Sequence, residues 1–132
     1  MKVLLTGSSK GIGFNIAKTL INEGHDVALH YNKNKSELDA LLKDSKTNSF
    51  TIQSDLSDSN QIKDLVKSTI DKLSFPDCII NNAGIAESAD ISIDFERWNE
   101  LFDRTIDVNL KAPSLIFKEF IKYKRVNKIN SR

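Results

Sequence analysis

Three glycines stand close together near the start of the chain, in the run Gly7-Ser8-Ser9-Lys10-Gly11-Ile12-Gly13. The run follows the apolar stretch Val3–Leu5 and opens an apolar pattern of helical spacing, so it predicts a turn from a strand into a helix. Glycines let a phosphate approach the backbone closely, because no Cβ stands in the way. The unpaired N–H groups and the positive dipole end of the helix would then bind that phosphate. The run therefore predicts a site for the diphosphate of a nicotinamide dinucleotide.

Together with Thr6, the glycine run reads Thr-Gly-x-x-x-Gly-x-Gly, and this spacing resembles the cofactor motif of the short-chain dehydrogenase/reductase family. Three further segments stand in the family's order, and they are Asp55-Leu56, Asn81-Asn82-Ala83-Gly84 and Asp107-Val108-Asn109-Leu110. The resemblance spans about Lys2 to Phe120. Within the family, the sequence is similar to the carbonyl reductases of the 3-oxoacyl reductase type. This resemblance implies an oxidoreductase that reduces carbonyls or oxidises alcohols.

The resemblance implies a role for each matching position. Backbone groups around Gly7, Ser9 and Ile12 would hold the diphosphate. Asp55, beside Leu56, would accept a hydrogen bond from the adenine amino group. The residues expected at the cofactor are thus those of the glycine run and of the motifs after the strands, namely Gly7, Ser8, Ser9, Lys10, Gly11, Ile12, Gly13, Asn32, Lys33, Asp55, Leu56, Asn82, Ala83 and Gly84.

The later motifs would lie toward the nicotinamide. By the resemblance, Asn82, Ala83 and Gly84 would line the adenosine ribose, and Asn109 would hold a water in a proton relay. Asn109 also continues the apolar stripe of its helix, where a polar group needs partners, so a purely structural role is the main alternative.

The end of the second expected strand bears on the choice of cofactor. Proteins specific for NAD(H) usually place an acid there for the ribose 2′-hydroxyl, whereas this strand ends His30-Tyr31-Asn32-Lys33. Lys10 stands where the family's NADP-preferring members carry a basic residue, and Lys33 is a second group for the 2′-phosphate. We therefore expect NADP(H) to be preferred and NAD(H) to remain possible. The alternative is that both lysines are solvated surface charges.

The family's hydride chemistry needs a Ser and a Tyr-x-x-x-Lys pair, in which the tyrosine is the general acid and base. Tyr31 and Lys35 fit that spacing, but they follow the second strand at the adenosine end of the cofactor. The chain alone is thus not expected to transfer hydride, and a second chain could supply the missing half. The alternatives are a non-catalytic nucleotide-binding or assembly module, or a truncated gene product.

Apolar strands alternate with helical patterns and must position these residues. The strands are expected at Val3–Leu5, Val27–Leu29, Phe50–Ile52 and Cys78–Ile80. Helices are expected after the glycine run, at 36–43, from a cap at Ser57 or Asp58 to residue 73, and from about 95 to 123.

The alternation predicts an α/β fold with a Rossmann-like, doubly wound parallel sheet in three α/β/α layers, in one domain spanning 1–132. We expect it to be truncated after about the fifth strand, since Val126 to Arg132 could be a weak fifth strand or a frayed tail. Pro113 is expected to break or kink the long helix.

The long helix carries more apolar residues than one sheet face needs. Trp98, Phe102 and Ile106 share one helical face and are expected in the core. The excess of apolar residues farther along, together with an uncovered sheet edge, predicts a homo-oligomer formed through the 106–123 helix. These apolar residues are Leu115, Ile116, Phe117, Phe120 and Ile121.

Composition and charge exclude several classes of binding partner. The chain has 132 residues and a net charge of +1, which favours neither nucleic acid nor an acidic membrane. No apolar run reaches membrane-spanning length. Cys78 is the single cysteine and is expected in the core; no Cys/His cluster has zinc spacing, so we expect no metal site and a reduced, cytoplasmic protein. His25 and His30 have no visible catalytic partner and are expected to play no catalytic part.

Overall fold

The computed structural model describes residues 1–87 and 89–130, without the side chains of 127–130. Four strands of the described chain form one sheet in the order β3-β2-β1-β4. They are β1 (Lys2–Leu5), β2 (Asp26–Tyr31), β3 (Phe50–Gln53) and β4 (Cys78–Ile80). All three strand pairs are parallel. The chain returns across β1 to form β4, so the direction of winding reverses between β1 and β4.

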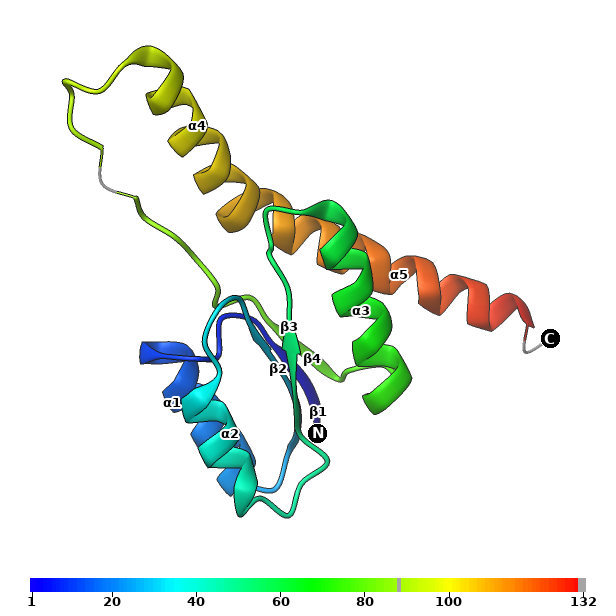
Figure 1. The fold of residues 1–132 in the computed structure, drawn as a ribbon. Helices are drawn as coiled ribbons and strands as arrows, with labels where there is room; N and C mark the ends of the chain where they lie inside the picture. Colours follow the sequence, from blue (N-terminus) through cyan, green and yellow to red (C-terminus); the bar gives the residue numbers. More distant parts are fainter. Residues whose placement is uncertain (88, 131–132) are drawn as a thin grey trace.

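Helices cover both faces of the sheet, with α1 and α2 on one face and α3 and α5 on the other (Figure 1). They are α1 (Gly11–Asn22), α2 (Ser36–Lys43), α3 (Ser59–Leu73), α4 (Phe95–Ile106) and α5 (Ala112–Asn130), with a π-helical segment η1 (Asp107–Lys111) between the last two. Asp58 caps α3 by accepting from the Asn60 N–H. This arrangement confirms the predicted doubly wound sheet.

The core has two halves because side chains alternate between the faces of each strand. Val3 and Leu5 point into the half beneath α1 and α2, and Leu4 points into the half beneath α3 and α5. All three are fully buried, which explains why this strand reads as a continuous apolar run. Cys78 is only partly buried, since β4 is an edge strand with one neighbour in the described sheet.

Residues 95–130 form one long helical rod, and Pro113 does not break it. Pro113 is the second residue of α5, directly after the π-helical turns of η1. The wider turns take up the proline ring and its missing N–H, so the helix continues. The alternative of a fifth strand from Val126 is also wrong, because helix α5 runs on to Asn130. Residues 131 and 132 lie outside the described part.

The prediction that the apolar face of α4 lies in the core is wrong. Trp98 is 44% exposed, Phe102 59% and Ile106 38%, and no residue of α4 is buried. The helix projects away from the sheet as an arm (Figure 1). Helical spacing tells which side chains share a face, but it does not tell what covers that face. None of the helices in the described chain, α4 included, has the length and apolar character that a membrane span needs.

The packing of α5 against the sheet gives a stability prediction. Ile116 is fully buried in the half-core beneath α3 and α5, whereas its neighbour Phe117 is 61% exposed. We expect Ile116→Ala to lower the free energy of unfolding by about 2 to 5 kcal/mol, because it removes buried methyl groups and leaves a cavity. The control Lys118→Ala, at an exposed polar position of the same helix, should change it by less than about 0.5 kcal/mol. Urea titration measures both, and equal losses would contradict this packing.

Candidate functional site: a dinucleotide cleft

A cleft of about 660 Å³ opens at the carboxyl ends of the strands, beside the point where the winding reverses. Open α/β sheets bind their ligands at this place. Five parts of the chain line it: the glycine turn, the ends of β2 and β3, the segment after β4, and the α4–η1 region. The lining residues are Gly7, Ser9, Lys10, Gly11, Ile12, Gly13, His30, Asn32, Lys33, Asn34, Ser54, Asp55, Leu56, Asn82, Ala83, Gly84, Ile85, Arg104 and Val108.

Two glycines of the turn are required by close contacts, and one of them, Gly7, also by its conformation. Gly7 has φ +66°, in the left-handed region that favours glycine, and a Cβ there would stand 2.8 Å from the Cα of Ala83. A Cβ on Gly13 would stand 2.0 Å from the carbonyl oxygen of Gly7. The start of α1 therefore lies directly against the turn, as the sequence predicts for a phosphate-binding loop.

The motif after β4 is tied to the turn by four hydrogen bonds. The side-chain amide of Asn82 donates to the carbonyls of Thr6 and Gly7, both at 3.0 Å. In return, the Thr6 hydroxyl accepts from the backbone N–H of Asn82 at 3.1 Å and of Ala83 at 3.0 Å. Asn82 thus serves the shape of the cleft as well as its lining.

His30 is a site residue that the sequence patterns do not single out. It is the fifth residue of β2, is 2% exposed and lines the cleft. Its Nδ1 accepts the Gly7 N–H at 3.0 Å, and its Nε2 lies 2.9 Å from the Ser54 carbonyl. These partners require the neutral ring with its proton on Nε2. Burial lowers the pKa of His30 below its ordinary 6.5, which keeps the ring neutral.

Ser8 differs from its neighbours in the turn because it faces inward. It is fully buried, and both its N–H and its hydroxyl donate to the His30 carbonyl at 2.9 Å. Ser8 does not line the cleft, unlike Ser9. Its place in the turn is structural, so the structure gives no support to the expectation that Ser8 contacts the cofactor.

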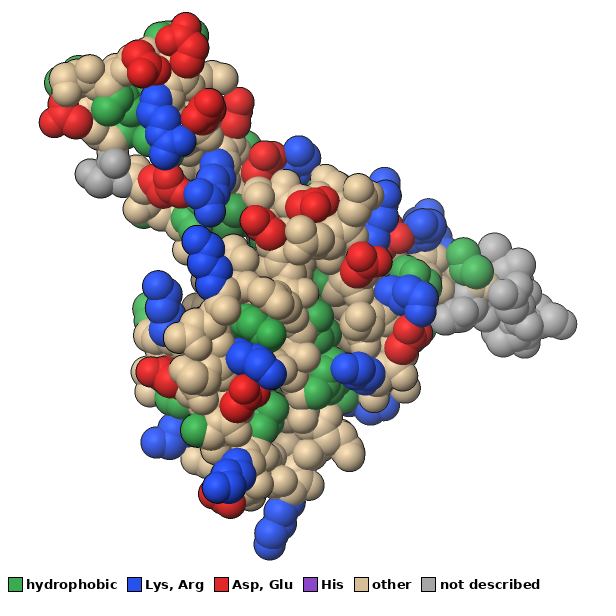
Figure 2. All heavy atoms as spheres, in the orientation of Figure 1, with side chains coloured by type: hydrophobic (Ala, Val, Ile, Leu, Met, Phe, Trp, Pro, Cys, Tyr) green, Lys and Arg blue, Asp and Glu red, His purple; other side chains and the backbone are tan. Residues whose placement is uncertain are grey.

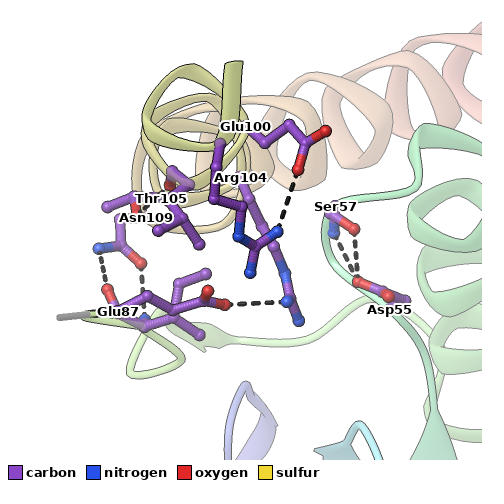
Figure 3. A network of polar contacts seen from close by, with 10 residues as sticks. Asp55, Ser57, Glu87, Glu100, Arg104, Thr105 and Asn109 are labelled. Atoms are coloured by element: carbon purple, nitrogen blue, oxygen red, sulfur yellow. Dashed lines mark hydrogen bonds and ion pairs between the residues drawn. The ribbon is translucent and has the colours of Figure 1, made fainter. Parts of the chain in front are cut away.

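Asp55 lies at the end of β3 with its carboxylate already oriented. One oxygen, Oδ1, accepts from the Ser57 N–H at 2.9 Å and from the Ser57 hydroxyl at 2.7 Å (Figure 3). These hydrogen bonds lower the pKa of Asp55, and the nearby positive charge of Arg104 lowers it further. Asp55 is therefore an anionic hydrogen-bond acceptor at the cleft, next to Leu56, which also lines it.

Asn109 forms a bracket on the chain after β4. Its Oδ1 accepts from the Ile85 N–H and its Nδ2 donates to the Ile85 carbonyl, both at 2.8 Å (Figure 3). Asn109 lies in η1 and does not line the cleft. Both halves of its amide are engaged with backbone, which fits the structural role that was the alternative to a proton relay.

Every site residue predicted from the sequence lines the cleft, with the exception of Ser8 and Asn109. The cleft adds lining residues that the sequence analysis did not select, and they are His30, Asn34, Ser54, Ile85, Arg104 and Val108. A buried histidine in an apolar strand was a usable signal, because buried polar groups need partners. Arg104 had no such signal. In the described chain, no three His, Cys, Asp or Glu residues gather as a metal site.

A glycine turn at the winding reversal of a parallel sheet is characteristic of the Rossmann fold, in which dinucleotides bind at that point. The family profile described as short chain dehydrogenase matches residues 1–129, and the chain belongs to that family. Among curated relatives, the 3-oxoacyl-[acyl-carrier-protein] reductase FabG of Staphylococcus aureus is 33% identical over 112 residues, which cover 83% of this chain and 44% of that protein. The NADPH-dependent pterin aldehyde reductase of Arabidopsis thaliana is 32% identical over 122 residues, covering 90% and 49%.

Solved structures agree with this placement. A blue fluorescent protein from a metagenomic library, in complex with NADPH, has a TM-score of 0.80 and 27% identity, covering 92% of this chain and 50% of that one. A short chain dehydrogenase from Burkholderia cenocepacia, in complex with NADP, has a TM-score of 0.79 and 27% identity, covering 91% and 49%. The chain thus spans about half the length of the relatives it matches.

The His30 contacts predict a pH dependence of stability. The folded state lowers the pKa of His30, so the unfolded state binds more protons between the lowered pKa and 6.5. The stability linked to the neutral ring is complete above pH 6.5 and is lost as the pH falls through the folded-state pKa. We expect urea unfolding from pH 8 to 5 to show this loss, and His30→Gln to remove that part of the slope. His25→Gln, at the partly exposed histidine, should keep the wild-type profile; a slope unchanged in His30→Gln would contradict the assignment.

Proposed function

We propose that this chain binds NADP(H) in the cleft, as the cofactor-binding part of an oxidoreductase that reduces carbonyls or oxidises alcohols. The observation that carries the proposal is that Lys10 and Lys33 line the same cleft as the glycine turn. In the described chain the one acidic lining residue is Asp55, at the end of β3, so no acid stands at the end of β2 for a ribose 2′-hydroxyl. The NADPH and NADP complexes among its structural neighbours support the same choice.

The start of α1 fits a diphosphate. Its cap residue Lys10 makes no side-chain capping bond, and the first turn holds no acid, so the positive end of the helix is left to a ligand. The N–H groups of Gly7 and Ser8 donate to Nδ1 and to the carbonyl of His30, so they are not free for a ligand. The phosphates would therefore be held by the N–H groups farther along, from Ser9 to the beginning of α1, where the lack of a Cβ on Gly13 lets the helix start directly against the turn.

The adenosine part would lie at the ends of β2 and β3. Asn32 and Lys33 follow β2, and Asp55 and Leu56 follow β3. Ser54 adds a fit to a polar ligand, since its hydroxyl is buried at the cleft and has no hydrogen-bond partner in the described structure. On this proposal Asn82, Ala83 and Gly84 line the path from the adenosine ribose toward the nicotinamide.

NADPH supplies a hydride when bound, and the residues of this chain bind and orient it. Proton transfer to the substrate needs a positioned acid such as the family's tyrosine. Tyr31 is buried in β2, and Lys35 forms an ion pair with Asp39 at 3.3 Å, so these two do not make a Tyr-Lys pair. We therefore propose that hydride transfer requires Ser, Tyr and Lys from polypeptide beyond these 132 residues, such as a second chain. A nucleotide-binding module without turnover is the other outcome.

Calorimetric titration with NADPH and NADH tests the cofactor proposal. We expect NADPH to bind more tightly, and Lys10→Ala with Lys33→Ala to weaken NADPH by about tenfold while NADH changes little, because the lost contacts are to the 2′-phosphate. Lys18→Ala is the control, since this exposed lysine of α1 does not line the cleft. Equal affinities for the two dinucleotides in the wild-type chain would refute the NADP(H) preference.

We also propose a homo-oligomer formed along the α4–α5 rod. Of the apolar residues that suggested it, Ile116 and Phe120 are buried in the core, so they do not serve an interface. The exposed apolar residues extend the surface onto α4 instead, and they are Phe95, Trp98, Phe102, Ile106, Leu110, Phe117 and Ile121. Their spacings of three, four and seven residues keep them on one side of the rod. An exposed stripe of this kind favours association with a second copy.

Sedimentation at micromolar concentration tests the oligomer. We expect a mass above 14.9 kDa for the wild-type chain and a shift toward the monomer in Phe102→Lys, because a charge in an apolar interface is costly to bury. Glu100→Lys is the control, at an exposed position of the same helix that helical spacing places away from the apolar stripe. A monomeric wild-type mass would rule the oligomer out.

The remaining expectations concern the whole chain. We propose that residues 1–132 act as one domain, with both half-cores built on the same sheet. The single cysteine, Cys78, fits a reduced cytoplasmic protein.

A further inference from the structure

Arg104 is the one residue of α4 that lines the cleft. The two lysines of the lining belong to the glycine turn and to the end of β2, whereas Arg104 extends from the helical arm toward the side where Asp55 lies (Figure 3). Lysine and arginine side chains accordingly lie on both sides of the notch between the arm and the sheet (Figure 2). We propose that Arg104 is a cofactor-binding residue whose guanidinium packs flat against the adenine base; this inference rests on the proposed NADP(H) site.

The guanidinium of Arg104 is held in place from the chain after β4. Its NH1 lies 2.8 Å from Oε1 of Glu87, and the two side chains are 44% and 29% exposed. A partly exposed ion pair of this kind adds little to stability. Its main consequence is to join the arm to the segment beyond β4, which keeps the guanidinium near the rim of the cleft.

The charges around Arg104 decide which part of the cofactor it meets. Asp55 and Glu87 both place carboxylates near it. A phosphate at this position would be repelled by two like charges, whereas a neutral base would not. Adenine offers a flat π face, which a guanidinium plane favours, and an amino edge, which the anionic Asp55 can accept. The apolar side chains of Leu56 and Val108 line the same cleft.

Titration of the full chain with NADPH and with adenosine 2′,5′-bisphosphate tests the contact. We expect Arg104→Gln to weaken both ligands by about tenfold, because both carry the base. Arg104→Lys should weaken them to a similar degree, since it keeps the charge but loses the plane. The control is Arg97→Gln on the same helix, whose side chain pairs with Glu100 and does not line the cleft; it should bind like the wild type.

The variant Glu87→Gln tests whether Arg104 contacts the base or only joins the arm to the chain after β4. If Arg104 touches the base, removing its ion-pair partner should weaken binding by less than about threefold, the size of a partly exposed ion pair. A loss in Glu87→Gln as large as in Arg104→Gln would show that Arg104 acts only as a tether and would overturn the inference. So would wild-type affinities in Arg104→Gln, given an unchanged melting curve. If the wild-type chain binds neither ligand, the proposed function fails as well.

Discussion

The close approach of Gly13 to the carbonyl of Gly7 is the constraint on which the site depends. A Cβ at Gly13 would also stand 2.5 Å from Nδ2 of Asn82, so three segments meet at one point without space between them. Because α1 starts there, its direction over the sheet is set by that contact. Asn82 reaches the two carbonyls of the turn only because no side chain lies between them. The phosphate cradle and the lining after β4 are therefore parts of one packed unit.

A buried polar network supports that unit from beneath. His30 joins the turn to the end of β3 through Gly7 and Ser54, and its own carbonyl receives both donors of Ser8. Inside a protein such hydrogen bonds are strong, and each missing partner is costly. The inward-facing N–H groups of the turn are thus already hydrogen-bonded within the protein. The N–H groups that remain for a ligand are those at the start of α1.

Much of the fold could be predicted from local patterns. Burial on both faces explains the continuous apolar strands and hence the parallel, doubly wound sheet. Capping chemistry placed the start of α3 at Ser57 or Asp58, and Asp58 is the cap. Neighbouring residues determine both features. The glycine spacing likewise located the cleft. His30 was missed because its importance comes from two distant segments, Gly7 and Ser54, that only the folded sheet brings together. Pro113 misled because proline is disruptive in an α-helical turn, but less so after the wider turns of η1.

The arm formed by α4 shows where sequence periodicity stops being informative. An apolar stripe in the sequence shows which side chains share one face of a helix, but it does not show what packs against that face. Here the stripe that includes Trp98 and Phe102 is exposed. The arm is positioned by its continuity with α5, which packs in the core, and is joined to the chain after β4 by the Asn109 bracket on Ile85 and the Arg104–Glu87 pair. The stripe and Arg104 belong to the same helix, so a partner that covers the stripe would restrict the helix that carries Arg104. Association through α4 and dinucleotide binding would then favour each other, because linkage between two sites acts in both directions.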